Sequence, residues 1–156
     1  MPLPEGFNLR RASVADLDTL VAHRRAMFQD MGYRDEAALT SMSEKFSIWL
    51  LEHMQAGNYQ AWLVSDSSGS PAAGAGLWLM DWPPHMIGKG GRGNLLNVYT
   101  EERFRRRGLA RHLMEAAVRW CGENQIDTII LHASPAGRVL YESMGFKATN
   151  EMRLQL

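Results

Sequence analysis

The chain has 156 residues, 46% of them hydrophobic and 22% charged, and its 17 basic side chains equal its 17 acidic ones. This balance excludes a global field toward nucleic acid or an anionic membrane, and we expect one globular domain over residues 1–156. A single cysteine, Cys121, excludes an internal disulfide. With neither a secretory leader nor an apolar run of about 18 residues, we expect a cytoplasmic protein.

The first half of the chain predicts a strand, two helices and a hairpin. Residues 7–12 form the strand, and Ser13 with Asp16 makes a capping box for a helix over about 14–30, which ends at Gly32. Apolar residues at helical spacing predict a second helix over roughly 40–56. Two apolar runs, 59–64 and 73–80, flank the turn-rich segment DSSGSP and predict an antiparallel hairpin.

The second half predicts alternating strands and helices after a loop over residues 81–93. The loop segment Gly88–Gly93 matches G-x-G-x-x-G, but no strand precedes it and no helix follows, so we interpret it as flexible. A central strand, Leu95–Tyr99, leads through a polar turn to a helix from Gly108 to about 123. We then expect a strand over 128–133, a helix from Pro135 to about 145, and a last hairpin of 146–147 with 152–156. The order β-α-α-β-β-β-α-β-α-β predicts an α/β fold with a mixed central sheet flanked by helices.

The strand, turn and helix over residues 94–118 predict an anion site. The first N–H groups of a helix lack internal partners, and the helix dipole adds about half a positive charge there. Gly108 permits close approach of the backbone, and Arg105, Arg106, Arg107 and Arg111 add positive charge. We therefore expect a phosphate or pyrophosphate at this helix start, with a solvated basic turn as the alternative.

Two segments carry a resemblance to a known family. The spacing Arg105-x-x-Gly108-x-Ala110 resembles the Arg/Gln-x-x-Gly-x-Gly/Ala signature of the GCN5-related N-acetyltransferase (GNAT) superfamily, and residues 132–146, HASPAGRVLYESMGF, resemble its later Asn-x-x-Ala-x-x-Leu-Tyr-x-x-x-Gly-Phe element. The resemblance covers residues 72–147 well and the N-terminal half by layout. It implies the GNAT fold, acetyl-CoA as co-substrate, and acetyl transfer to a primary amine by direct attack.

The resemblance also implies which residues bind the coenzyme. They come from the central strand, the basic turn and the last helix: Val98, Tyr99, Arg105, Arg106, Arg107, Gly108, Leu109, Ala110, Arg111, Ser134, Arg138 and Tyr141. Ser134 stands where the family usually has Asn and Gly137 where it often has Ala, so Ser134 either contacts the ligand or caps the following helix.

Three residues are implied in catalysis. Tyr141 matches the family tyrosine that protonates the departing thiolate, with core packing as the alternative. The Val98 N–H is the leading oxyanion donor, with ordinary strand pairing as the alternative. The family's strand Glu is missing from residues 94–99, so the general base is open. His132 is the first candidate, ahead of His85, Asp81 and Glu101, although a buried, hydrogen-bonded histidine is the alternative.

The acceptor pocket of this fold lies where the first two helices and the 81–93 loop converge. We expect Phe28, Met31, Tyr33, Trp82 and Asn97 to contact the acceptor. The alternatives are core packing for the apolar and aromatic side chains and a structural amide for Asn97. Four acidic residues are candidates to attract an ammonium group, namely Asp30, Asp35, Glu36 and Asp81.

The expected function is therefore an acetyl-CoA-dependent N-acetyltransferase that acts on the amine of a small molecule or a peptide. We expect no metal, because the five histidines lack ligand spacing, and no nucleic-acid or membrane partner. A homodimer through edge strands is possible. A non-catalytic acyl-CoA-binding sensor or scaffold is the alternative function.

Overall fold

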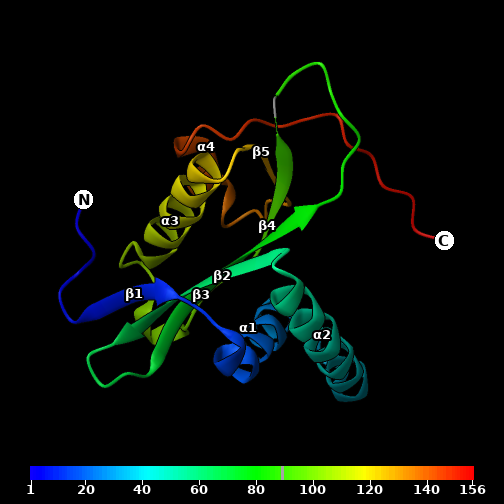
Figure 1. Ribbon diagram of the computed structural model, residues 1–156. Coiled ribbons are helices and arrows are strands. Elements are labelled where there is room, and N and C mark those ends of the chain that lie inside the picture. Colours follow the sequence, from blue (N-terminus) through cyan, green and yellow to red (C-terminus); the bar gives the residue numbers. More distant parts are fainter. Residues whose placement is uncertain (89) are drawn as a thin grey trace.

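The computed structural model describes residues 1–88 and 90–156. The strands are β1 (Phe7–Arg11), β2 (Tyr59–Asp66), β3 (Pro71–Met80), β4 (Gly91–Thr100) and β5 (Ile126–Leu131). The helices are α1 (Leu17–Asp30), α2 (Glu36–Ala56), α3 (Leu109–Glu123) and α4 (Arg138–Ser143). Short 3-10 turns precede α1 at Val14–Asp16 and α3 at Glu102–Phe104. The predicted α/β class is confirmed (Figure 1).

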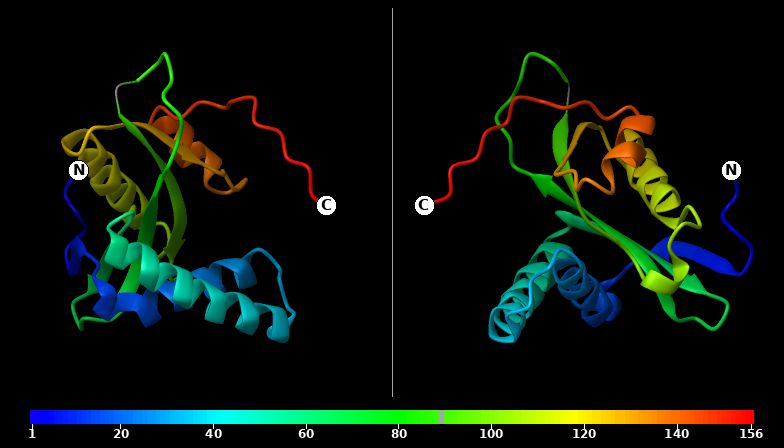
Figure 2. Two further views of the ribbon diagram at one scale, coloured as in Figure 1. Left: turned by 45° about the vertical axis from the view of Figure 1, so that its right-hand side comes forward. Right: turned by 180° about the vertical axis from the view of Figure 1, so that it is seen from behind.

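Over the described ranges, the strands form one five-stranded sheet in the order β1-β2-β3-β4-β5. Neighbours from β1 to β4 are antiparallel, and β5 runs parallel to β4. Figure 2 shows α1 and α2 on one face and α3 on the other. Leu20, Phe46 and Leu50 pack on the first face, while Leu113 and Met114 of α3 pack on the second. The sheet therefore separates two cores.

Local signals fix the helices of the first face. The capping box of Ser13 and Asp16 is present and starts the turn before α1. Helix α2 begins at Glu36, before the predicted start near residue 40, because the Asp35 carboxylate accepts from the Ala38 N–H at 3.1 Å. It ends where predicted, with Gly57 in the left-handed conformation.

Strand β4 is longer than predicted and takes in Gly91–Gly93. A Cβ at Gly93 would lie 2.7 Å from Leu77 on β3, and one at Gly90 would lie 1.8 Å from the Gln125 carbonyl. These glycines therefore permit close packing between neighbouring segments, so the prediction of a flexible loop over the whole glycine run was wrong. Lys89, within that run, lies outside the described residues.

The C-terminal region differs most from prediction. Residues 135–137 form a turn, so α4 begins at Arg138 rather than at Pro135. The predicted last hairpin is not formed in the described chain, since residues 146–156 contain no strand. Met152, Leu154 and Leu156 alternate as in a strand but are 94%, 84% and 106% exposed, because the segment extends away from the sheet and has no strand beside it (Figure 1).

A bulge interrupts β4 beside the middle of the sheet. Gly76 of β3 pairs with Leu96 and Gly74 with Tyr99, so Asn97 and Val98 together face one residue of β3. Asn97 takes a positive φ of 55°, which is uncommon for a residue other than glycine. The bulge turns the Asn97 side chain toward the face covered by α1 and α2, where it contacts Tyr59 and Arg24.

No helix in the described parts of the chain is long and apolar enough to cross a bilayer.

Candidate functional site

The start of α3 has the geometry of an anion site. Gly108 precedes the helix with a φ of 78°, and a Cβ built there would meet nothing within 4 Å. The N–H groups of Leu109, Ala110 and Arg111 have no acceptor among the described residues, and the first helical bond runs from His112 N–H to the Gly108 carbonyl at 3.3 Å. The start of α3 therefore offers N–H donors without acceptors next to open space, and an anion site requires both.

The arginines around this point differ in how they are held. Arg105 donates to the Thr100 carbonyl at 3.0 Å and to the Asp30 carboxylate of α1, and Arg111 donates to the Ser143 hydroxyl of α4 at 2.6 Å. Arg106 takes a φ of 65°. Arg107 lies 5.9 Å from the Phe7 ring centroid. Arg105 and Arg111 therefore hold the turn against α1 and α4, and their side chains are already hydrogen-bonded. The backbone N–H groups at the start of α3 are thus the principal donors left for an anion.

Strands β4 and β5 part next to this helix start. Their pairing runs from Gly91 and Ile126 to Leu95 and Leu131, where β5 ends. Beyond Leu95, β4 continues to Thr100 with β3 on one side only. The stretch that contains Val98 and Tyr99 therefore has one edge that β5 does not cover. Ligands of open α/β sheets bind where parallel strands end in this way.

Asn97 is bonded at both ends of its amide. Its Nδ2 donates to the Tyr59 hydroxyl at 2.9 Å, and its Oδ1 accepts from Arg24 Nη1 at 2.7 Å. Tyr59 is 3% exposed, and burial raises the pKa of its phenol to about 12. A Cβ on Gly76 would lie 1.9 Å from the Tyr59 hydroxyl oxygen, so β3 needs glycine where this side chain crosses it. The network fixes the conformation of the bulge.

His23 lies beside this network and was not predicted as a site residue. It is 4% exposed, its ring centroid lies 5.1 Å from that of Tyr99, and its Nδ1 has no partner in the described chain. Burial lowers the pKa of His23 to about 4 from 6.5, although the Glu101 carboxylate lies 4.0 Å from Nε2. His23 is therefore neutral in the folded protein at pH 7.

We expect His23 to make stability pH-dependent. The folded state holds a lowered pKa of about 4, so the unfolded state binds the proton more readily between pH 6.5 and pH 4. The free energy of unfolding should therefore fall by about 2 kcal/mol from pH 7 to pH 5. Urea titrations at both pH values, repeated with His23→Gln, isolate the contribution of this residue. Equal losses in the two proteins would contradict the assignment.

A small cavity of about 180 Å³ brings together three predicted residues, His132, Arg138 and Tyr141. Burial raises the pKa of Tyr141, and its hydroxyl has no protein hydrogen bond among the described residues. His132 lies beyond the end of β5 and faces Glu151 at 3.1 Å, with its side chain 59% exposed. The alternative of a buried His132 was therefore wrong.

The two departures from the second family signature have structural reasons. The Ser134 hydroxyl accepts from the Gly137 N–H at 3.1 Å, so it caps the turn before α4. A Cβ at Gly137 would lie 2.8 Å from the Tyr141 ring and hydroxyl, so alanine does not fit under this tyrosine.

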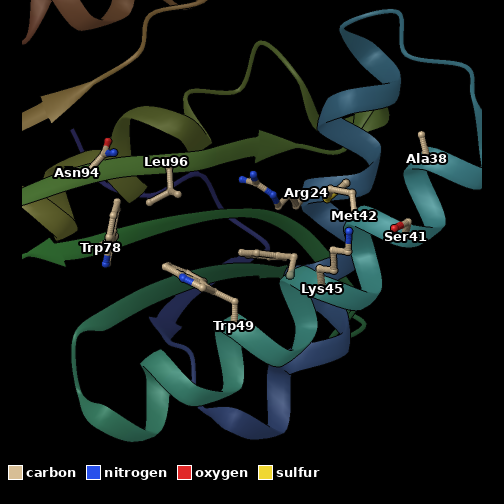
Figure 3. A pocket seen from close by; sticks show the side chains of 10 residues that line it. Arg24, Ala38, Ser41, Met42, Lys45, Trp49, Trp78, Asn94 and Leu96 are labelled. Carbon is tan, nitrogen blue, oxygen red and sulfur yellow. The ribbon is translucent and has the colours of Figure 1, made fainter. Parts of the chain in front are cut away.

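The large pocket of the chain lies elsewhere than predicted. A cavity of about 740 Å³ opens between α1, α2 and the strands β3 and β4 (Figure 3). Its lining consists of two cationic, three polar or small, and five apolar or aromatic side chains: Arg24, Lys45, Ala38, Ser41, Asn94, Met42, Phe46, Trp49, Trp78 and Leu96.

The residues predicted to contact an acceptor do not line this cavity. Met31 and Tyr33 are 52% and 57% exposed, Tyr33 packs on Phe28, and Trp82 lies under Arg92 with 4.3 Å between guanidinium and ring centroid. Asn97 is behind the cavity wall, bonded to Arg24. The cavity is bordered by α1, α2, β3 and β4, and neither the end of α1 nor residues 81–88 line it.

The acidic residues proposed to attract an ammonium group also lie outside the cavity. Asp30 pairs with Arg105, Glu36 pairs with Arg25, and Asp35 caps α2. Asp81 is exposed and does not line the cavity either. The two charged side chains that do line it, Arg24 and Lys45, are both cationic.

The sequence does hold a signal for Arg24 and Lys45. Arg24 follows Leu20 and Val21 at helical spacing and precedes Phe28, and Lys45 stands between Met42 and Trp49 in the same way. A charged residue within the apolar stripe of a helix either reaches past it to solvent or serves a buried ligand.

Among the described residues, neither a thiol nucleophile nor a metal centre is placed at this site. Cys121 is 1% exposed on α3, and burial raises the pKa of its thiol to about 11. It lies at the opposite end of α3 from Gly108, so it is a poor nucleophile for this site. Among the residues that the structure describes, no group of three or more His, Cys, Asp and Glu side chains could hold a metal ion.

Comparisons with known proteins agree with this geometry. The model of the acetyltransferase (GNAT) family matches residues 19–146. A protein from Ralstonia eutropha JMP134, described as a GCN5-related N-acetyltransferase, is 36% identical, with a TM-score of 0.88 over 97% of this chain and 99% of that chain. A predicted acetyltransferase from Clostridium acetobutylicum, solved with acetyl-CoA, is 27% identical, with a TM-score of 0.86 over 96% and 95%. No curated protein gives a significant match.

Proposed function

Because the chain belongs to the acetyltransferase (GNAT) family, we propose that it transfers an acetyl group from acetyl-CoA to a primary amine by direct attack. The observation that carries this proposal is the meeting of two features. Strands β4 and β5 part after Leu95, and the free N–H groups that follow Gly108 lie at the end of the same strand–turn–helix segment. The relative from Clostridium acetobutylicum, solved with acetyl-CoA, supports the choice of ligand.

The residues at the start of α3 fit a pyrophosphate. The N–H groups of Leu109 to Arg111 have no protein acceptor among the described residues, and the space in front of Gly108 is open. These donors would bind the two phosphates, with Arg106 and Arg107 adding charge. When bound, acetyl-CoA supplies an acyl group activated as a thioester.

The exposed edge of β4 would hold the reacting group. The backbone of Val98 and Tyr99 would pair with the pantetheine arm, and the Val98 N–H would donate to the thioester oxygen as it gains negative charge. The amine nitrogen forms a bond to the carbonyl carbon while the carbon–sulfur bond breaks. The amine then loses a proton, for which His132 is our candidate acceptor, directly or through water.

Tyr141 would supply a proton to the departing sulfur. It lines the same cavity as His132 and Arg138, and its hydroxyl is free to donate. The raised pKa keeps the phenol protonated at neutral pH. Ser134 already caps a turn, and we propose that it contributes to coenzyme binding mainly by holding this turn.

We expect Tyr141→Phe to lower kcat by about 10-fold and to leave the Kd for coenzyme A unchanged. The expected effect is smaller than the contribution of about 100-fold or more that is usual for acid catalysis, because a thiol with a pKa near 8.5 leaves readily as the thiolate. Steady-state thiol release gives kcat, and calorimetry gives the Kd. An unchanged kcat would assign Tyr141 to packing alone.

The function itself is tested by calorimetry with coenzyme A and by thiol release from acetyl-CoA across a panel of amines. Binding with a dissociation constant in the micromolar range and transfer to at least one amine are expected. Absence of binding at millimolar coenzyme A would overturn the proposal. Binding without transfer to any amine would instead support a non-catalytic acyl-CoA sensor.

A further inference from the structure

We propose that the acceptor amine carries an anionic group, a carboxylate or a phosphate, on an apolar body, and that Arg24 and Lys45 bind the anion. The inference rests on the proposed function, because it names the substrate class of the same site. It is argued from the 740 Å³ cavity between α1, α2, β3 and β4.

The cavity adjoins the strand that would hold the thioester. Asn94 and Leu96 line it, and they belong to β4 immediately before the bulge at Asn97. Arg24 lines the cavity and also donates to the Asn97 amide at 2.7 Å. An amine held in this cavity would therefore lie against Leu96, where the edge of β4 that β5 leaves uncovered begins.

Arg24 is a cation without a counterion. It is partly buried between Phe28 and Phe46, whose ring centroids lie 5.1 and 4.7 Å from its guanidinium carbon. Among the described residues, its one side-chain hydrogen bond goes to a neutral amide, and its buried Nε has no partner. No described carboxylate lies within ion-pair distance of it. A desolvated charge in this state is strongly stabilised by an anion.

Lys45 adds a second positive charge from the facing helix. Its side chain lines the cavity from α2 and is exposed (Figure 3). Like Arg24, it has no acidic partner in the described chain, and the lining contains neither Asp nor Glu. Two cations of this kind attract an anionic acceptor and repel a polycationic one, such as an aminoglycoside.

The remaining walls select an apolar body. Trp49 of α2 and Trp78 of β3 meet edge to face at 5.7 Å between centroids, and Leu96 and Met42 extend the surface (Figure 3). Asn94 also lines the cavity, and its amide oxygen is buried without a partner among the described residues. An amino acid with a large apolar side chain, or an amphipathic amino-phosphate, combines these features.

The experiment compares matched amines in thiol release from acetyl-CoA. The pairs are L-phenylalanine with L-phenylalaninamide and 2-aminoethyl phosphate with 2-aminoethanol, and kanamycin is the polycationic member. We expect kcat/KM to be at least 10-fold higher for the anionic member of one pair. The pair that shows the preference distinguishes a carboxylate from a phosphate. The amine of L-phenylalaninamide is less basic than that of L-phenylalanine, so a larger fraction of it is neutral and able to attack. A preference for L-phenylalanine therefore cannot come from easier deprotonation of its amine.

Variants locate the anion. Lys45→Glu changes an exposed side chain, so the fold should persist, and the anionic-to-neutral ratio of kcat/KM should fall at least 10-fold. Lys45→Arg should retain the ratio. Arg24→Gln should lower it as well, and Arg119→Gln, an exposed arginine on α3, is the matched control that should leave it unchanged.

The outcomes separate two failures. Transfer to neutral amines or to kanamycin with equal or greater kcat/KM would overturn this inference and leave the acetyltransferase proposal intact. If neither Lys45→Glu nor Arg24→Gln changes the anionic-to-neutral ratio of kcat/KM, the assignment of the anion to this cavity is overturned. If coenzyme A binds but no amine on the panel accepts acetyl, both proposals are overturned.

Discussion

Replacing Gly108 by valine is expected to weaken coenzyme A binding by about 100-fold. A side chain at this position would enter the open space at Gly108, the residue that precedes the free N–H groups of Leu109 to Arg111, and we place the pyrophosphate there. It would separate the phosphates from donors that each contribute about 1.5–3 kcal/mol to a charged ligand. Calorimetric titration of coenzyme A into the folded variant measures the loss.

The control for Gly108→Val must carry the same backbone strain. Gly69, in the turn between β2 and β3, has a φ of 83° against 78° for Gly108, and its Cβ would also meet nothing within 4 Å. Gly69→Val should therefore lower stability by a similar amount, as thermal unfolding reports, and leave the Kd unchanged. If both variants bound coenzyme A as the parent does, the helix start would not be the pyrophosphate site.

Replacing Gly76 by alanine is expected to lower the free energy of unfolding by about 3 kcal/mol. The added methyl group would lie 1.9 Å from the Tyr59 hydroxyl oxygen and 2.5 Å from its ring carbon. Tyr59 is enclosed by the core of α1 and α2, so it can move only by breaking its bond with Asn97 and opening space around it. Urea unfolding measures the loss.

Two comparisons show whether the Tyr59 contact causes the effect. Gly122→Ala adds a methyl group with no neighbour within 4 Å, and within a helix it should be neutral or slightly stabilising. In a Tyr59→Phe background, Gly76→Ala should cost less than in the parent, because the nearest atom is removed. Equal costs in both backgrounds would mean that the hydroxyl is not the obstacle.

The parts of the fold that follow from local chemistry could be predicted from the sequence. Ser13 with Asp16, Gly57 and Gly108 mark helix ends through backbone geometry that few other residues adopt. The strand-to-helix passage at Gly108 was predicted for this reason, and the anion site at this helix start stays a prediction. The start of α2 was missed because Asp35 caps it through a single side-chain bond, which the apolar period does not reveal.

The 740 Å³ cavity, in which we propose that the acceptor binds, could not be predicted, because it depends on how two helices cross the sheet. Phe28 and Tyr33 have the composition of a pocket, but they pack on each other near the end of α1. Arg24 is part of the wall because the β4 bulge brings Asn97 within reach of it. The prediction of a final strand was wrong for a related reason. Met152, Leu154 and Leu156 alternate with polar residues as in a strand, but a strand needs a neighbour to pair with, and the sequence does not specify one.

The burial of Cys121 has a practical consequence for the measurement of thiol release from acetyl-CoA. This residue carries the only sulfhydryl of the chain, it is closed off inside the core of α3, and its thiolate is strongly disfavoured. Disulfide dyes react with thiolates that they can reach. In the folded protein such a dye should therefore register coenzyme A released during turnover with almost no background from the enzyme. A slow colour increase without substrate would in turn report unfolding.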